Sequence, residues 1–288
     1  MKSSTIADFL KTVIKGEDID IRSFSSLSNI AENSVVFANK FNLNYVAILN
    51  EHKVLALVGK DYEGQLGGSY IVSNNPRLDF VRVVQEFFVK KPVASIHPSA
   101  VVENGALIGK NVSIGPNCHI SSESIIGDNT IIQANVSLLN KVTLGTNCYI
   151  EPGTVLGGEG FGYEYDEDGV PIHFPHAGDI VIGNNVCIGS NTCIDRGTID
   201  STIIDDDVKI DNLVHIGHNV HVRKNTLIVA GTVICGGAQI GENCWISPNA
   251  SLHQKITVGD NAKVGIGAVV LGRVREGQTV FGVPAKKL

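Results

Sequence analysis

The phrase Leu107-Ile108-Gly109-Lys110-Asn111-Val112 returns in related form as Gln239-Ile240-Gly241-Glu242-Asn243-Cys244. Each phrase places an aliphatic residue before a small one, and the pattern repeats every six residues. Aliphatic residues hold this position without a miss from Ile96 to Leu156, again from Ile182 to Ile194, and then from Ile204 to Val270. A six-residue period sustained over such a length is typical of a β-helix.

The hexad also predicts how the side chains are arranged. The aliphatic residue points into the helix, the next small residue permits a tight corner, and a later small residue fills the remaining interior. Three hexads make one triangular coil of about 18 residues, so that residues 18 apart stack on one another. Because each coil buries its apolar side only against its neighbours, the ends of such a solenoid need caps.

Two interruptions break the period. Residues 157–179 form an insertion that carries Phe161, Tyr163, Tyr165 and Phe174 among acidic residues. This insertion is either a surface excursion that packs on its own coil or on a neighbouring subunit, or a loop that folds over an active-site groove. The second interruption, at 199–204, is expected to be a shortened coil corner.

Residues 1–92 follow a different pattern, which predicts a small α/β domain. Residues 5–10 are expected to form the start of a short helix, and residues 54–58 and 69–72 are predicted to be buried strands. A helix is expected after Pro76, which suits a first helical turn. Lys90-Lys91-Pro92 marks the boundary, and 93–288 is expected to be the β-helix domain. The N-terminal domain is a suitable cap.

Composition narrows the classes of function. The formal charge of −6 and the pI near 5.8 argue against a nucleic-acid-binding face. No stretch approaches the ~20 apolar residues of a membrane span, and residues 1–10 do not form a signal peptide. The six cysteines show no CxxC motif and are expected to be reduced, which favours a cytoplasmic protein.

Three histidines, His215, His218 and His221, lie three residues apart in one coil. They could be surface residues, a zinc site shared between subunits as in γ-class carbonic anhydrases, or, for His218, a general base. An extended backbone fans the three side chains apart, which argues against a metal site. His218 falls two residues beyond the inward Ile216, so it is predicted to project from a corner.

Stacking adds a second element to this corner. Gly236 follows His218 by 18 residues and is expected one coil away. A base beside a backbone N–H that can hold an oxyanion provides the minimum parts for acyl transfer.

At these residues the chain resembles the UDP-3-O-acylglucosamine N-acyltransferase family of lipid A synthesis. The matching phrases are Gly160-Phe161-Gly162-Tyr163, Ile194-Asp195-Arg196-Gly197, Ile210-Asp211-Asn212 and Ile216-Gly217-His218-Asn219-Val220, with Ala230-Gly231 and Gly236 at family spacing. Residues 72–76 resemble part of that family's uridine-binding domain. The resemblance spans nearly the whole chain.

The resemblance implies a left-handed parallel β-helix, a homotrimer and no metal in the chemistry. It also implies that His218 is the base and Gly236 the oxyanion donor. The residues expected to contact the substrate are Asp211, Asn212, Asn219, Phe37, Asn39, Phe161, Tyr163, His253 and Lys255. Phe37 is equally readable as a core residue, and either His253 or Lys255 could take the place of the family's second histidine.

The resemblance therefore implies N-acylation of a nucleotide-activated amino sugar, with an acyl carrier protein thioester as donor and no cofactor. Val280–Leu288 instead resembles the short ending of sugar acetyltransferases that use acyl-CoA, which leaves the donor open. A paralogue acting on an amino-dideoxy sugar for O-antigen is an alternative. A zinc lyase and a non-catalytic scaffold are alternatives from other classes.

Overall fold

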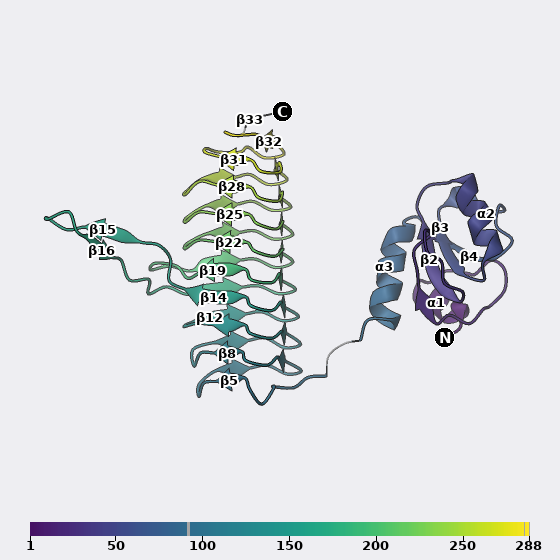
Figure 1. Ribbon diagram of the computed structural model, residues 1–288, viewed down its shortest axis with the longest axis horizontal. Coiled ribbons are helices and arrows are strands. Elements are labelled where there is room, and N and C mark those ends of the chain that lie inside the picture. Colours follow the sequence, from purple (N-terminus) through teal and green to yellow (C-terminus); the bar gives the residue numbers. More distant parts are fainter. Residues whose placement is uncertain (91–92, 285, 288) are drawn as a thin grey trace. The chain divides into compact units, whose positions relative to one another are not determined.

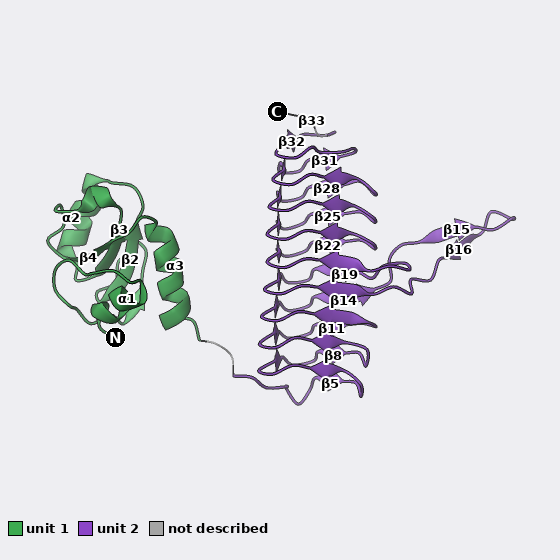
Figure 2. Ribbon diagram, turned by 180° about the vertical axis from the view of Figure 1, so that it is seen from behind, with its two compact units in different colours: residues 1–91 green, residues 92–288 purple. Residues whose placement is uncertain are grey.

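The computed structural model describes residues 1–90, 93–284 and 286–287. The chain divides into two compact units, Met1–Lys91 and Pro92–Leu288 (Figure 2). This division falls one residue before the expected boundary, and Lys91 and Pro92 themselves lie outside the described residues. Among the described residues, no helix is both long and apolar enough to cross a bilayer.

The first unit is a four-stranded parallel sheet in the order β1-β2-β3-β4, with helices packed on it. The predicted strands and helices form, and the sequence interpretation missed β1, β2, α2 and η1. The elements are α1 (Ser3–Phe9), β1 (Ser23–Phe24), β2 (Ser34–Ala38), α2 (Leu43–Glu51), β3 (Leu55–Val58), the 3-10 turn η1 (Lys60–Tyr62), β4 (Ser69–Val72) and α3 (Pro76–Phe87).

Helix α3 begins where the sequence predicts. The side chain of Asn75 accepts a hydrogen bond from the backbone N–H of Leu78 at 3.1 Å, which caps the helix, and Pro76 occupies the first turn. One side of the sheet buries a cluster that includes Val35, Leu57 and Val83.

The second unit is a parallel β-helix, which confirms the mainly β fold expected from the hexad (Figure 1). Its strands form three sheets among the described residues. Ten strands form the first sheet: β7 (Ser113–Ile114), β10 (Ile131–Ile132), β13 (Tyr149–Ile150), β18 (Cys187–Ile188), β21 (Lys209–Ile210), β24 (Leu227–Ile228), β27 (Trp245–Ile246), β30 (Lys263–Val264), β32 (Thr279–Phe281) and the antiparallel β33 (Lys286–Lys287).

The other two sheets have nine and eight strands. The nine-stranded sheet contains β5 (Val101–Val102), β8 (His119–Ile120), β11 (Ser137–Leu138), β14 (Val155–Gly158), β19 (Cys193–Asp195), β22 (His215–Ile216), β25 (Val233–Ile234), β28 (Ser251–Leu252) and β31 (Val269–Val270). The eight-stranded sheet contains β6 (Leu107–Ile108), β9 (Ile125–Ile126), β12 (Val142–Leu144), β17 (Ile180–Ile182), β20 (Thr202–Ile204), β23 (His221–Val222), β26 (Gln239–Ile240) and β29 (Thr257–Val258).

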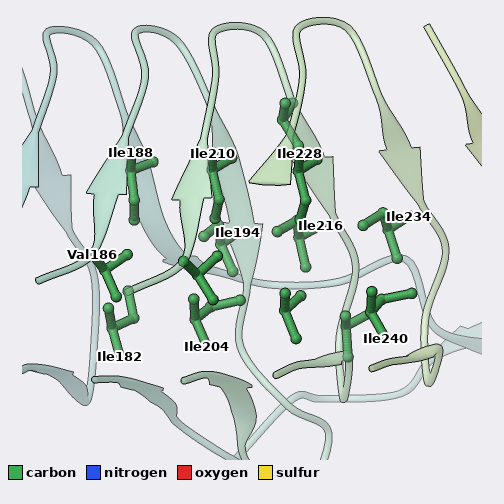
Figure 3. Packing of buried hydrophobic residues seen from close by; sticks show 14 of the residues in the cluster. Ile182, Val186, Ile188, Ile194, Ile204, Ile210, Ile216, Ile228, Ile234 and Ile240 are labelled. Carbon is green, nitrogen blue, oxygen red and sulfur yellow. The ribbon is translucent and has the colours of Figure 1, made fainter. Parts of the chain in front are cut away.

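The aliphatic hexad position fills the interior, as predicted. Ile188, Ile210 and Ile228 stack in one column and are at most 3% exposed (Figure 3). All six cysteines are free. Cys118, Cys148 and Cys244 are buried in the helix interior, and burial raises the pKa of each thiol.

The two interruptions have different structures. The insertion between β14 and β17 contains the hairpin β15 (Tyr163–Tyr165) and β16 (Pro171–His173), which extends away from the stacked coils (Figure 1). The prediction of a shortened corner at 199–204 is wrong. Cys187 pairs with Lys209, and Cys193 pairs with His215, at a spacing of 22 rather than 18. The coil is longer here because its corner bulges to meet the root of the hairpin, where Ala177 N–H donates to the Thr198 carbonyl.

Candidate active site at a coil corner

His218 lies at the corner between β22 and β23. Ile216 and Val222, which belong to those strands, point into the helix and are fully buried. The corner between them turns the side chain of His218 outward, as the hexad predicts. The two histidines three residues away each lie beside an acid: His215 Nε2 lies 3.6 Å from the Asp195 carboxylate, and His221 Nε2 lies 3.0 Å from the Asp205 carboxylate.

A hydrogen-bond chain fixes the tautomer of His218. The Oδ1 of Asn219 accepts hydrogen bonds from the backbone N–H of Thr198 at 3.1 Å and from its hydroxyl at 2.9 Å. Because a backbone N–H can only donate, Oδ1 is an acceptor, and His218 Nδ1, 3.0 Å away, must carry the proton. The neutral imidazole therefore keeps a free lone pair on Nε2, as a general base requires. Asn219 orients this base.

Gly236 lies directly against the imidazole. A Cβ added to Gly236 would stand 2.6 Å from His218 Nε2 and 2.8 Å from its Cε1. The Gly237 N–H donates to the His218 carbonyl at 2.8 Å and holds the two coils in register. The free lone pair of His218 thus lies beside a backbone that only glycine permits.

The N–H of Gly236 is also available. At other corners, an Asp or Asn of the next coil accepts the N–H at the matching position, as Asp128 does from Lys110 and Asn212 does from Ser190. The residue of the next coil beside Gly236 is Gln254, and among the described residues the Gly236 N–H has no acceptor. An unpaired donor beside a base is the arrangement that an oxyanion requires.

His176, which the sequence interpretation missed, packs on His218 from the root of the hairpin. It is 1% exposed, and the centroids of the two imidazole rings are 5.0 Å apart. Burial lowers the pKa of His176, its hydrogen bond to the Phe174 carbonyl opposes this, and a positive charge on His218 lowers it again. In the sequence, Gly160 and Gly162 are the residues that hinted at a close contact of this kind. In the structure, a Cβ at either position would stand 2.8 Å from the His176 ring.

Asp195 and Arg196 of the preceding coil lie under this corner. Burial raises the pKa of the Asp195 carboxyl, and the positive charges that His215 and His218 can carry lower it. Arg196 is paired with Glu159 at 2.5 Å, and Glu159 also lies 3.1 Å from His173 of the hairpin. The hairpin root is therefore tied to the coil by charge as well as by packing.

Two predicted substrate residues lie at a different corner in the same chain. Asp211 and Asn212 follow β21, between the ten- and nine-stranded sheets. The Asp211 carboxylate accepts from the N–H groups of Asn212 and Ala230, and Asn212 Oδ1 accepts from Ser190. Both brace their own corner, and one chain alone does not bring them beside His218.

Other predicted residues lie nearer to the base. His253 and Lys255 belong to the coil beyond Gly236, where the Lys255 N–H donates to the Gly236 carbonyl at 2.9 Å. Phe161 and Tyr163 continue from the hairpin root with their ring centroids 4.9 Å apart, and Phe161 is 89% exposed. The insertion is thus a projecting hairpin whose root covers the candidate base.

Phe37 and Asn39 lie in the first unit, beside a pocket of about 500 Å³ lined also by Lys40 and Tyr45. Phe37 serves the core as well, since its ring centroid lies 4.9 Å from that of Phe80. Asn39 Oδ1 accepts from the backbone N–H of Arg77 at 3.0 Å, which joins the end of β2 to the start of α3.

Histidine, cysteine and acidic side chains nowhere gather in threes in a metal-binding arrangement within residues 1–90, 93–284 and 286–287. The three histidines of the corner turn toward Asp195, Gly236 and Asp205, so they do not converge on one ion.

The chain is a parallel β-helix built from hexads, with a histidine on one corner. The bacterial transferase hexapeptide (six repeats) model matches residues 123–158 and 237–272. The chain is also similar in sequence to proteins named UDP-3-O-acylglucosamine N-acyltransferase. It is 40% identical over 161 residues to UDP-3-O-acylglucosamine N-acyltransferase 1 of Francisella tularensis subsp. holarctica, which covers 48% of this chain and 46% of the relative.

A second relative, the UDP-3-O-acylglucosamine N-acyltransferase of Pseudomonas syringae pv. tomato, is 32% identical over 207 residues, covering 65% of this chain and 58% of the relative. The chain thus spans about half the length of the curated relatives it matches. The solved structure of Francisella novicida UDP-N-acetylglucosamine acyltransferase superposes with a TM-score of 0.62 at 28% identity, covering 67% of this chain and 68% of that chain.

Proposed function

We propose that this chain is an N-acyltransferase that moves an acyl group from a thioester to the amino group of a nucleotide-activated sugar resembling UDP-3-O-acylglucosamine, in the synthesis of lipid A or a related cell-surface glycan. The proposal is carried by one observation: the Nε2 lone pair of His218 lies against Gly236, whose N–H is free. Relatives with this activity in their names support the choice of substrate.

The chemistry follows from these two groups. The sugar amine attacks the thioester carbonyl, so that a C–N bond forms, and the carbonyl oxygen becomes an oxyanion that accepts from the Gly236 N–H. His218 Nε2 takes the proton from the attacking nitrogen. When the tetrahedral intermediate collapses, the C–S bond breaks and the thiolate takes that proton from the His218 imidazolium. Asn219 keeps Nδ1 protonated throughout and so preserves the orientation of the ring.

The remaining assignments belong to the same proposal. The acyl donor is either an acyl carrier protein or CoA, and no cofactor takes part. The pocket beside Phe37 and Lys40 in the first unit binds the nucleotide. The assembly is a homotrimer, because Asp211 and Asn212 can reach His218 only from a neighbouring copy, and the protein acts in the cytoplasm.

Purified protein is incubated with UDP-3-O-acylglucosamine and with UDP- and dTDP-linked amino-dideoxy sugars, each with acyl carrier protein and acyl-CoA donors. Products are identified by mass. We expect an N-acylated product and a loss of about 10²- to 10⁴-fold in rate for His218→Ala, because the base is removed. His221→Ala is the matched control, because this histidine pairs with Asp205 and faces away. Full activity of His218→Ala would contradict the mechanism.

A further inference from the structure

The Nε2 atom of His176 has no hydrogen-bond donor among the described residues. The Nδ1 of His176 lies 2.9 Å from the Phe174 carbonyl oxygen and must donate to it, because a carbonyl can only accept. Nε2 of the neutral ring is then an acceptor, and it is buried without a hydrogen-bond partner. A buried acceptor without a donor costs free energy, so its position needs an explanation.

The position of this atom is set against the proposed base. The point that a Cβ on Gly160 would occupy lies 2.8 Å from His176 Nε2 and 2.9 Å from His218 Cδ2. The two imidazole rings meet nearly at right angles, with an interplanar angle of 74°. The free nitrogen of one ring and a C–H edge of the other thus lie beside the same point, which glycine at position 160 leaves without a side chain.

We propose that His176 is a positioning residue that holds the His218 ring and stabilises its imidazolium through the lone pair on Nε2. The proposal rests on the function proposed above, in which His218 becomes positively charged as it takes the proton of the amine. The C–H groups of an imidazolium are more polarised than those of neutral imidazole, so their attraction to a neighbouring lone pair grows as the proton moves. The interaction is therefore stronger in the transition state than in the ground state, which is what accelerates a reaction.

His176 suits this role because it stays neutral. Burial holds its pKa below the ordinary value for histidine, and a charge on His218 lowers it further. Two charged imidazoles would repel each other, whereas a neutral one offers its acceptor side. The other titratable groups around His218 are Asp195 and His215 on the coils and the His173–Glu159 pair at the hairpin root. Among the described residues, none of these groups packs a ring on His218 as His176 does.

The experiment compares two replacements of His176 in the full-length protein. His176→Phe keeps a ring of similar size but removes the acceptor, while His176→Gln returns an amide oxygen near the position of Nε2. We expect His176→Phe to lower kcat roughly tenfold with little change in KM for the sugar, and to move the acid limb of the kcat/KM profile to lower pH. His176→Gln should recover most of kcat.

His119→Phe is the matched control, because it removes a second imidazole that also has a buried unpartnered nitrogen but lies on β8, away from this corner. The inference is overturned if His176→Phe keeps the wild-type kcat and pH profile. It is also overturned if His176→Gln is as slow as His176→Phe while both melt at the wild-type temperature.

A readout without turnover separates this inference from the proposed function. ¹⁵N chemical shifts of the histidine rings report which nitrogen carries the proton. We expect His176 to remain in the neutral Nδ1–H form across the pH range in which the protein stays folded, and the ring ¹⁵N shifts of His218 to change when His176 is replaced by Phe. If the protein acylates no sugar but these shifts behave as expected, the function fails and the pairing of the rings stands. If His176 becomes protonated within this range, or if the His218 shifts do not change, the inference fails alone.

Discussion

At the scale of single residues, the candidate site is shaped by two glycines, which have no side chain. Gly160 and Gly236 lie on two sides of His218, and a Cβ on either would stand within 3 Å of its ring. The base is therefore confined between the hairpin root on one side and the next coil on the other. Such confinement limits the ring to the orientation that Asn219 selects.

Gly236→Ala should test this confinement. The added methyl would lie 2.6 Å from His218 Nε2, so the ring must tilt away from both the Gly236 N–H and the attacking amine. We expect kcat to fall by about 10²-fold or more, because a displacement near 1 Å is enough for such a loss. The kcat of the variant is measured from the product formed in quenched time points, which is quantified by mass spectrometry. Gly272→Ala is the control, since nothing lies within 4 Å of that position. Equal kcat for the two variants would contradict the confinement.

The sequence could predict only part of this site. His218 and Gly236 follow from the spacing of 18, because stacking is set by the hexad alone. His176 does not, because periodicity says nothing about where an insertion returns to the coil. Asn219 stays a predicted substrate contact, and the structure adds a second role for it, because its Oδ1 accepts from Thr198 and lies 3.0 Å from His218 Nδ1. Asp211 and Asn212 are predictable as corner residues, but their relation to the base depends on another copy.

At the scale of elements, asparagine shapes the corners between the short strands. Asparagine repeatedly occupies a corner position in the left-handed region, with φ near 58° at Asn129 and 56° at Asn111. The side chains also pair between coils, as Asn111 Nδ2 donates to Asn129 Oδ1 at 3.2 Å. The hexad predicts the inward residues and the corners well. The longer coil of 22 residues was misread, because a period that slips looks the same whether residues are lost or inserted in a corner.

Replacement of Asn129 tests the cost of the corner. Asn129→Ala forces a residue with a Cβ and no local hydrogen bonding into the left-handed region, which costs about 1–2 kcal/mol. Asn129→Gly removes the steric cost and loses only an exposed side-chain hydrogen bond. We expect a clearly lower urea midpoint for the alanine variant and a smaller decrease for the glycine variant. An alanine variant that is at least as stable as the glycine variant would refute this account of the corners.

At the scale of the whole molecule, each unit has its own hydrophobic core, while the site as proposed draws on more than one chain. The helix interior runs from Val112 to Val280, and the sheet of the first unit buries separate clusters on its two sides. Nothing in either core depends on a partner. The proposed substrate residue Asp211 and the proposed base His218 stand at separate corners of the same coil. A symmetric ring of three copies places one corner of each chain against another corner of its neighbour.

Mixed assemblies test whether the site is shared. His218→Ala and Asp211→Asn are each expected to be inactive. Asp211→Asn removes the negative charge of the carboxylate but keeps one oxygen that can accept from the backbone N–H groups of Asn212 and Ala230. When the two variants are co-expressed with different tags and purified together, one site in about four should combine an intact His218 with an intact Asp211 from the adjacent chain, and activity should return to about a quarter of the wild-type value. Sedimentation should give three times the 30.7 kDa chain mass for every sample. Mixed trimers without activity would mean that both residues must belong to one chain, and an active Asp211→Asn protein would remove that residue from the site.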